Sequence, residues 1–159
     1  MYWPANDVSG ESQMNLLTTD RRSIERGLIV RTRYIVISVR DPERRRPRIR
    51  QTAGLHAVLY LAFHDAEPVS GYNLPPNIRL MTPRIARAIW RFVQTNTESV
   101  ETIVCHCEQG MSRSPAIAVA LAEALGEDSE RIVRKTQPNK YVLELLRATV
   151  KIFRGKNDD

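Results

Sequence analysis

The sequence has few cysteines and few histidines. Its two cysteines, Cys105 and Cys107, exclude a framework of several disulfide bonds. Residues two apart in a strand are poorly placed to bridge each other, so we expect both thiols to be reduced. The three histidines, His56, His64 and His106, are scattered along the chain without a second pair of cysteines. A metal site is therefore not expected.

Long hydrophobic segments are also missing. The longest apolar runs are interrupted by charged residues, and the first twenty residues include Asp7, Glu11 and Asp20, which do not fit a signal peptide. Hydrophobic residues make up 42% of the chain and charged residues 26%, as in ordinary soluble domains. The length of 159 residues is enough for one domain with a substantial core. We expect a cytoplasmic chain without a membrane span.

Positive charge is in excess, with a net charge of +6. Aromatic residues make up only 6% of the chain and few lie near the basic residues, so a stacking platform for single-stranded nucleic acid is not indicated. The segment 44–50 is either a solvated loop or a patch for an anionic partner such as phosphorylated protein, nucleic acid or an acidic surface. Its arginines are Arg44, Arg45, Arg46, Arg48 and Arg50.

Apolar periodicity predicts strands alternating with helices. This order indicates an α/β fold with a single, mostly parallel central sheet flanked by helices. Residues 1–18 show no period and are expected to be a flexible lead-in to a catalytic domain over 19–155. The predicted strands are 34–39, 56–63 and 101–106. The predicted helices are 20–28, one opened by Thr82 and Pro83, 114–125 stopped by Gly126, 127–135, and one opened by Pro138 and Asn139.

The segment 103–115 places a predicted strand, a tight loop and the start of a helix around Cys107. Backbone N–H groups of such a loop, together with the helix dipole, form a cradle for an anion. The same field, with Arg113 opposite, favours a thiolate at Cys107 and makes it a nucleophile at neutral pH. Gly110 allows a tight turn, Arg113 can hold two phosphate oxygens, and Ser114 can donate a hydrogen bond to departing sulfur. These features predict phosphate chemistry.

The pattern His106-Cys107, five residues, Arg113-Ser114 resembles the signature of the cysteine-dependent protein tyrosine and dual-specificity phosphatase superfamily. The order of elements over roughly residues 20–153 is similar to that of compact dual-specificity phosphatases. No stretch resembles the phosphotyrosine-recognition loop of the classical tyrosine phosphatases. The resemblance implies a phosphocysteine intermediate and a loop-orienting role for His106. The phosphate-binding loop it implies is Glu108, Gln109, Gly110, Met111, Ser112 and Arg113.

Expelling the leaving oxygen requires a proton donor above the loop. The resemblance implies an aspartate upstream, and Asp65, which follows a predicted strand, fits by position. Glu67 and Asp41 remain alternatives. In the implied mechanism, Asp65 protonates the leaving group and then activates water, while Ser114 assists the departure of sulfur from phosphorus. Neither a metal nor a nucleotide cofactor is required.

The substrate is narrowed only in part. Glu108 and Gln109 stand where relatives resembling inositide phosphatases carry lysines, which disfavours a highly anionic head group. We therefore expect a protein tyrosine phosphatase or dual-specificity phosphatase that acts on phosphorylated protein or peptide, with phosphotyrosine first because aryl phosphates have the better leaving group. The alternatives are an RNA 5′-phosphatase, suggested by the arginine run, and a phosphate-binding module without catalysis. A sulfur-transfer or arsenate-reducing enzyme is disfavoured, because those families generally lack the histidine and serine that flank this motif.

Overall fold

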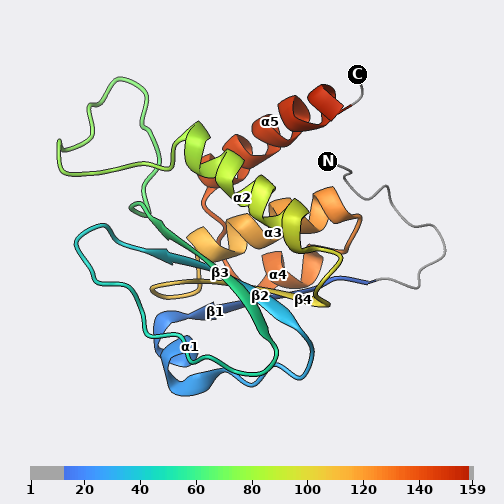
Figure 1. Cartoon of the computed structure of the whole chain (residues 1–159). Helices are drawn as coiled ribbons and strands as arrows, with labels where there is room; N and C mark the ends of the chain where they lie inside the picture. Colours follow the sequence, from blue (N-terminus) through green and yellow to red (C-terminus); the bar gives the residue numbers. More distant parts are fainter. Residues whose placement is uncertain (1–12, 158–159) are drawn as a thin grey trace.

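The computed structural model describes residues 13–157 and has one sheet of four parallel strands (Figure 1). The strand order is β1-β4-β2-β3, so that β4 and β2 are central. The predicted α/β fold with a parallel central sheet is confirmed. The strands are β1 Asn15–Asp20, β2 Tyr34–Arg40, β3 Leu55–Ala62 and β4 Thr102–Cys107.

The two central strands are apolar along their whole length because both of their faces are covered. All six residues of β4 are buried, as are the first six residues of β2. Such continuous burial is typical of parallel sheets that carry helices on both sides. Cys107 is the last residue of β4 and is paired in register with Asp20 of β1, while His106 is paired with Ser38 of β2. Cys107, the predicted nucleophile, therefore lies at the carboxyl edge of the sheet.

Two hydrophobic cores lie on the two faces of the sheet. The larger core includes Trp90 from α2, Leu121 from α3 and Leu146 from α5, and the smaller one includes Ile24 from α1. The Trp90 indole N–H donates to the Leu146 carbonyl at 3.1 Å and so joins α2 to α5. Figure 1 shows α1 apart from the other helices. The helices are α1 Arg21–Gly27, α2 Pro83–Asn96, α3 Arg113–Leu125, α4 Glu130–Lys135 and α5 Lys140–Asn157.

The predicted starts of the helices after Asp20 and Thr82 agree with the structure. Asp20 caps α1 by accepting a hydrogen bond from the Ser23 N–H at 2.6 Å, and Thr82 caps α2 by accepting one from the Ile85 N–H at 3.2 Å. The predicted helix 127–135 is shorter than expected, since α4 begins only at Glu130. No helix in the described part of the chain is both long enough and apolar enough to cross a membrane.

The prediction of a lead-in over residues 1–18 is wrong for residues 15–18, which form most of β1. The strand was missed because its sequence, NLLTTD, lacks a clear alternation of apolar and polar residues. The strand is formed by parallel pairing with β4, and this pairing extends from Asn15 to Asp20 of β1. The sheet therefore starts before the predicted domain boundary at residue 19. Residues 1–12 of the predicted lead-in lie outside the described residues.

Candidate active site

Cys107 ends β4, and the five residues after it form the loop that leads into α3. The Gly110 N–H donates to the Cys107 sulfur at 3.2 Å, and the Ser114 hydroxyl oxygen lies 3.2 Å from the same atom. Only 2% of Cys107 is exposed, so few water molecules can solvate the sulfur. Hydrogen bonds from the backbone and a hydroxyl replace them, which is the arrangement that a sulfur anion requires.

The loop lies directly against β1. Gly110 has a φ of +72°, in the left-handed region, and its N–H points at the sulfur in that conformation. A Cβ atom at this position would lie 2.9 Å from the carbonyl carbon and oxygen of Thr19. Neither the backbone conformation nor the available space accepts a side chain here. The backbone of β1, a strand that the sequence analysis did not predict, therefore packs directly against the loop at Gly110.

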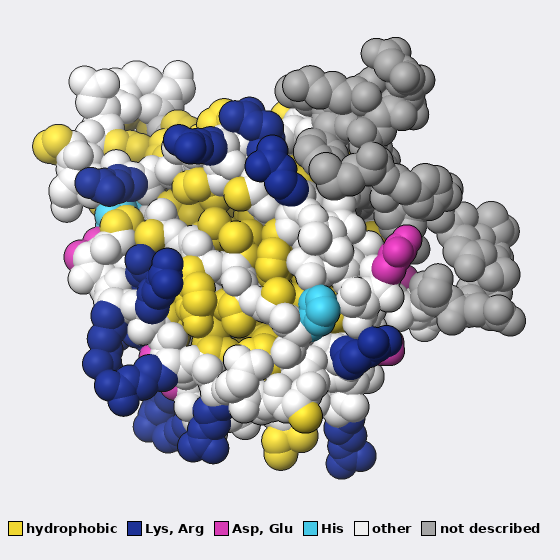
Figure 2. Space-filling view, viewed as in Figure 1, with side chains coloured by type: hydrophobic (Ala, Val, Ile, Leu, Met, Phe, Trp, Pro, Cys, Tyr) yellow, Lys and Arg dark blue, Asp and Glu magenta, His cyan; other side chains and the backbone are white. Residues whose placement is uncertain are grey.

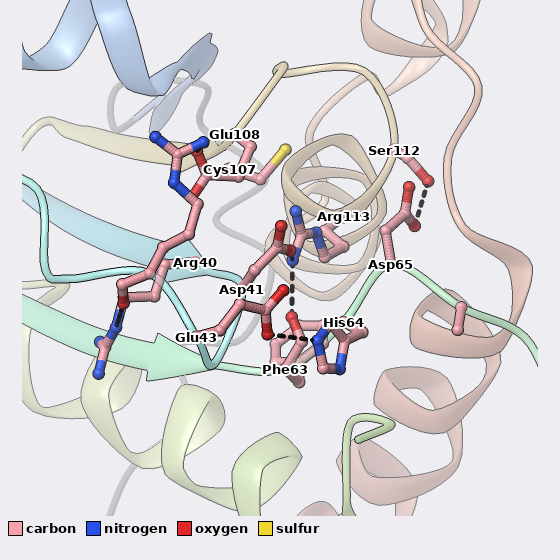
Figure 3. A network of polar contacts seen from close by, with 12 residues as sticks. Arg40, Asp41, Glu43, Phe63, His64, Asp65, Cys107, Glu108, Ser112 and Arg113 are labelled. Atoms are coloured by element: carbon pink, nitrogen blue, oxygen red, sulfur yellow. Dashed lines mark hydrogen bonds and ion pairs between the residues drawn. The ribbon is translucent and has the colours of Figure 1, made fainter. Parts of the chain in front are cut away.

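Arg113, the first residue of α3, is anchored by one end of its guanidinium group. Its Nη1 donates to the Asp41 carboxylate at 2.7 Å and to the Phe63 carbonyl at 2.6 Å (Figure 3). Its Nε is buried and has no partner among the described residues. A buried guanidinium N–H without an acceptor is costly unless a ligand supplies one. The planar guanidinium is thus held with an N–H free for an anion such as phosphate.

Asp65, the predicted acid, lies in the loop after β3 and is held by two hydrogen bonds. Ser112 donates its hydroxyl to Asp65 Oδ1 at 2.8 Å, and Asn139 donates its side-chain amide to the same oxygen at 2.9 Å. Asp65 Oδ2 has no partner in the described part of the chain. Since the two donors share one oxygen, the other oxygen can carry and deliver a proton. Figure 3 shows the contact between Asp65 and Ser112.

The two alternative acids are engaged elsewhere. Glu67 accepts a hydrogen bond from the Lys140 N–H at 2.7 Å, at the start of α5, and does not line the cavity over Cys107. Asp41 does line that cavity, but its Oδ1 accepts from Arg113. Asp41 is thus ion-paired with the arginine, whereas Asp65, which lines the same cavity, is hydrogen-bonded to a hydroxyl and an amide.

The candidate residues surround one open cavity of about 310 Å³. It combines the predicted nucleophile and the arginine with Asp65, four residues of the loop over 108–112 and a few apolar side chains. The cavity thus combines charged and polar groups with apolar groups that provide contact surface for an organic ligand. The lining residues are Asp41, His64, Asp65, Ala66, Ile78, Cys107, Glu108, Gln109, Met111, Ser112 and Arg113.

His106 supports the loop from inside the sheet. Its Nδ1 lies 3.3 Å from the Cys107 carbonyl oxygen, to which it can only donate, and its Nε2 lies 2.7 Å from the Ser38 hydroxyl. Burial lowers the pKa of His106, which keeps the ring neutral. A neutral ring that donates from Nδ1 must accept from the Ser38 O–H at Nε2. Cys105 is fully buried, which raises the pKa of its thiol, and the prediction that it belongs to the core is confirmed.

The loop that carries Asp65 is joined to the loop after β2 by a hydrogen bond between His64 and Glu43. His64 Nδ1 accepts from the Arg79 N–H at 2.9 Å, so its Nε2 carries the proton and donates to Glu43 at 2.7 Å (Figure 3). This hydrogen bond lowers the pKa of Glu43. The segments that supply Asp41 and Asp65 are therefore joined beside the cavity.

Sequence reasoning missed several residues of the site. Asn139 was recognised only as part of a helix start, yet its amide holds Asp65 while its Oδ1 caps α5 by accepting from the Val142 N–H at 3.0 Å. Ser38 and Phe63 could not be recognised from the sequence. Ser38 is a single polar residue in an apolar strand, and Phe63 contacts Arg113 through its backbone carbonyl, which every residue has. An asparagine directly after proline at a helix start was the only available hint.

Glu108 was expected to repel highly anionic groups at the mouth of the cavity. In the structure its carboxylate is paired with Arg21 at 3.2 Å and with Arg44 at 3.3 Å, and its side chain is 12% exposed. Because Glu108 is paired with two guanidinium groups, its negative charge is compensated and the expected repulsion of anions is not supported. The sequence did not indicate this pairing, since Arg21 lies far upstream in α1.

In this fold a cysteine ends a central parallel strand, a five-residue loop follows it, and an arginine opens the next helix. Solved structures show the same fold. Human DUSP28 is 14% identical, with 89% of this chain and 94% of that chain covered and a TM-score of 0.56. PTPMT1 in complex with PI(5)P is 16% identical, with coverages of 90% and 94% and a TM-score of 0.51. The predicted resemblance is thereby confirmed at the level of the fold.

No protein-family model and no curated protein sequence matches this chain. At the identities of the two solved structures, the likeness extends to the arrangement of strands and helices and not to the substrate.

Proposed function

We propose that this chain is a cysteine-dependent phosphomonoester hydrolase of the tyrosine and dual-specificity phosphatase superfamily, and that it acts on phosphotyrosine in proteins. The observation that carries the proposal is the state of Arg113. Its Nη1 is fixed by Asp41 and Phe63, while its Nε is buried without an acceptor among the described residues, and Arg113 lines the cavity over Cys107. A tetrahedral phosphoryl group bound there would supply the missing acceptor oxygen.

In the first chemical step, the Cys107 thiolate attacks phosphorus in line with the leaving oxygen. The sulfur–phosphorus bond forms as the phosphorus–oxygen ester bond breaks, and Asp65 transfers its proton to the departing oxygen. Loop N–H groups and the Arg113 guanidinium stabilise the charge on the phosphoryl oxygens. The products of this step are the free alcohol or phenol, a phosphocysteine and the Asp65 carboxylate.

In the second step, water replaces the leaving group. The Asp65 carboxylate removes a proton from the water as its oxygen attacks phosphorus, and the sulfur–phosphorus bond breaks. Ser114, whose hydroxyl oxygen lies 3.2 Å from the sulfur, can donate a hydrogen bond to the thiolate as it forms. Inorganic phosphate leaves and both catalytic groups return to their starting states.

Phosphotyrosine suits this cavity better than a small aliphatic phosphate. Ala66, Ile78 and Met111 present apolar surface around the charged base, where an aromatic ring can pack. A phenol is also a better leaving group than the hydroxyl of serine or threonine. Both properties support a preference for aryl phosphates.

The proposal is tested by steady-state hydrolysis of matched peptides that carry phosphotyrosine, phosphoserine or phosphothreonine. PI(5)P, which the solved PTPMT1 structure contains, and a triphosphorylated RNA complete the panel. We expect phosphotyrosine peptide to be hydrolysed fastest, Cys107→Ser to be inactive and a Cys105→Ala control to retain activity. Wild-type protein that binds phosphate but hydrolyses none of the panel would instead support a non-catalytic phosphate-binding module. Faster hydrolysis of RNA or PI(5)P would assign a different substrate.

A further inference from the structure

A second cavity of about 360 Å³ opens beside the candidate active site. It is lined by four arginines and two glutamates, which gives its wall an excess of positive charge. Figure 2 shows Lys and Arg side chains gathered at the lower left of the molecule, where Figure 1 shows α1 and the loop after β2. The lining residues are Arg21, Arg22, Glu25, Arg44, Arg45 and Glu108.

The arginine run that lines this cavity is fixed to the fold rather than loosely solvated. The Arg44 carbonyl accepts from Arg40 Nε at 3.0 Å, and the Arg45 carbonyl accepts from Arg21 Nη2 at 2.8 Å. The Arg46 guanidinium lies 4.6 Å from the centre of the Tyr60 ring, a cation–π contact. Pro47 is buried. The segment therefore presents its charges from a defined position.

The arginines of this second cavity divide into two groups. Arg21 is buried and all of its contacts are internal, to Glu25 at 2.8 Å, to Glu108 at 3.2 Å and to the Arg45 carbonyl. By contrast, Arg22 and Arg45 are exposed and have no ion pair among the described residues. Arg21 thus acts as the internal support of the cavity, whereas Arg22 and Arg45 are available to a ligand.

Glu108 lines both cavities and directly follows Cys107 in sequence. A ligand bound over Cys107 can therefore extend past Glu108 into the second cavity. Glu108 itself stands between the two, with Arg21 and Arg44 on its carboxylate. A compact polyphosphate or inositide would place its second phosphate close to the first, beside Glu108, where Arg21 and Arg44 are already ion-paired. An extended peptide, which advances about 3.3 Å per residue, can carry a second anion beyond it.

We propose that Arg22 and Arg45 bind a second anionic side chain of a phosphopeptide substrate, close in sequence to the phosphorylated residue in the active site. This inference rests on the proposed phosphatase function. The second anion is a carboxylate of Asp or Glu or the phosphate of a second modified residue, since a guanidinium group recognises both. The site thus selects phosphotyrosines in acidic or multiply phosphorylated segments.

Binding by the Cys107→Ser protein tests the second site without requiring turnover. Fluorescence anisotropy would compare phosphotyrosine peptides that are identical except for a neutral residue, glutamate or phosphoserine within three positions of the phosphotyrosine. The variant Arg22→Gln/Arg45→Gln is added to Cys107→Ser. The matched control, Arg87→Gln/Arg91→Gln, removes the same charge from exposed positions of α2 that line neither cavity.

We expect the doubly anionic peptides to bind about tenfold more tightly than the neutral one, and this advantage to fall below about twofold in Arg22→Gln/Arg45→Gln. The α2 control should keep the full advantage, and added salt should reduce it. In the active protein, both double variants should hydrolyse a small aryl phosphate at the wild-type rate. An equal affinity of wild type for neutral and anionic peptides would overturn the inference.

The two proposals can fail separately. Hydrolysis of the aryl phosphate without any preference for anionic peptides would reject the second site and leave the phosphatase function standing. A preference in binding without any hydrolysis would reject the phosphatase function. If vesicles containing PI(5)P or a triphosphorylated RNA lost more affinity than the peptides in Arg22→Gln/Arg45→Gln, the site would belong to a lipid or nucleic-acid ligand and the peptide proposal would be wrong.

Discussion

Replacing Gly110 by alanine should disable the loop around Cys107 while the sheet remains folded. The added methyl group would lie 2.9 Å from the Thr19 carbonyl carbon and oxygen, closer than real Cβ atoms approach other groups. Because Thr19 belongs to β1, which is hydrogen-bonded to β4, the backbone on that side cannot move easily. The loop must shift instead, and it carries the Gly110 N–H away from the sulfur.

The magnitude follows from two separate contributions. An alanine with a φ near +72° costs about 1–2 kcal/mol of stability relative to glycine, and the contact with Thr19 adds about 1–3 kcal/mol of overpacking. Losing the hydrogen bond from Gly110 to the thiolate removes about 1.5–3 kcal/mol from the anion. If that loss is felt fully in the attack on phosphorus, kcat/KM for an aryl phosphate should fall roughly 10- to 150-fold.

Gly71 provides the matched control. It also has a positive φ, +82°, but a Cβ at this exposed position would meet nothing within 4 Å. Gly71→Ala should therefore lower the free energy of urea unfolding by about 1–2 kcal/mol and leave kcat/KM unchanged. Protection of Cys107 from iodoacetamide by inorganic phosphate gives a second measurement, and it should weaken in Gly110→Ala only. An aryl phosphatase activity of Gly110→Ala within twofold of wild type would refute the role assigned to this N–H.

Three further substitutions test the acid and the supports of the loop. Asp65→Asn should lower kcat for a phosphotyrosine peptide by about 10²- to 10⁴-fold and leave iodoacetamide labelling of Cys107 unchanged; an unaltered kcat would exclude Asp65 as the acid. Asn139→Ala removes a donor 2.9 Å from Asp65 and the cap of α5, so kcat should fall about tenfold and stability by about 1 kcal/mol; a loss of stability alone would limit Asn139 to capping. The pKa of His106 is lowered in the folded state by burial, so its contribution to stability is complete above about pH 6.5 and is lost as the pH falls below that value. Urea unfolding at pH 5.5 and 7.5 should therefore show a smaller pH dependence for His106→Gln than for wild type, and an equal dependence would contradict the neutral buried ring.

The part of the site that forms within one short segment was predictable. Cys107, Arg113 and Ser114 are joined by a strand, a loop and a helix start, and each of these has its own local signal in the sequence. The parallel sheet followed from the alternation of apolar strands with amphipathic helices, whereas β1 did not, because an edge strand with mixed polarity carries no period.

The arginine run could be located but not interpreted from the sequence. The two interpretations, a solvated loop and an anion-binding patch, differ in whether the backbone of the run is held in place. The hydrogen bonds that hold it come from Arg21 and Arg40, which lie outside the run. The sequence shows that the segment is positively charged, but only these tertiary contacts show where its side chains lie.

By itself the sequence determined the fold class and located the cysteine and the arginine of the predicted phosphate-binding loop, because these groups are close along the chain and their geometry is fixed by local backbone structure. The tertiary structure alone decided that Asp65 lines the cavity over Cys107, that Asn139 donates a hydrogen bond to it, and that β1 lies behind Gly110. These contacts join residues far apart in the chain. They exist only once the parallel pairing of the strands brings their carboxyl ends to one edge of the sheet.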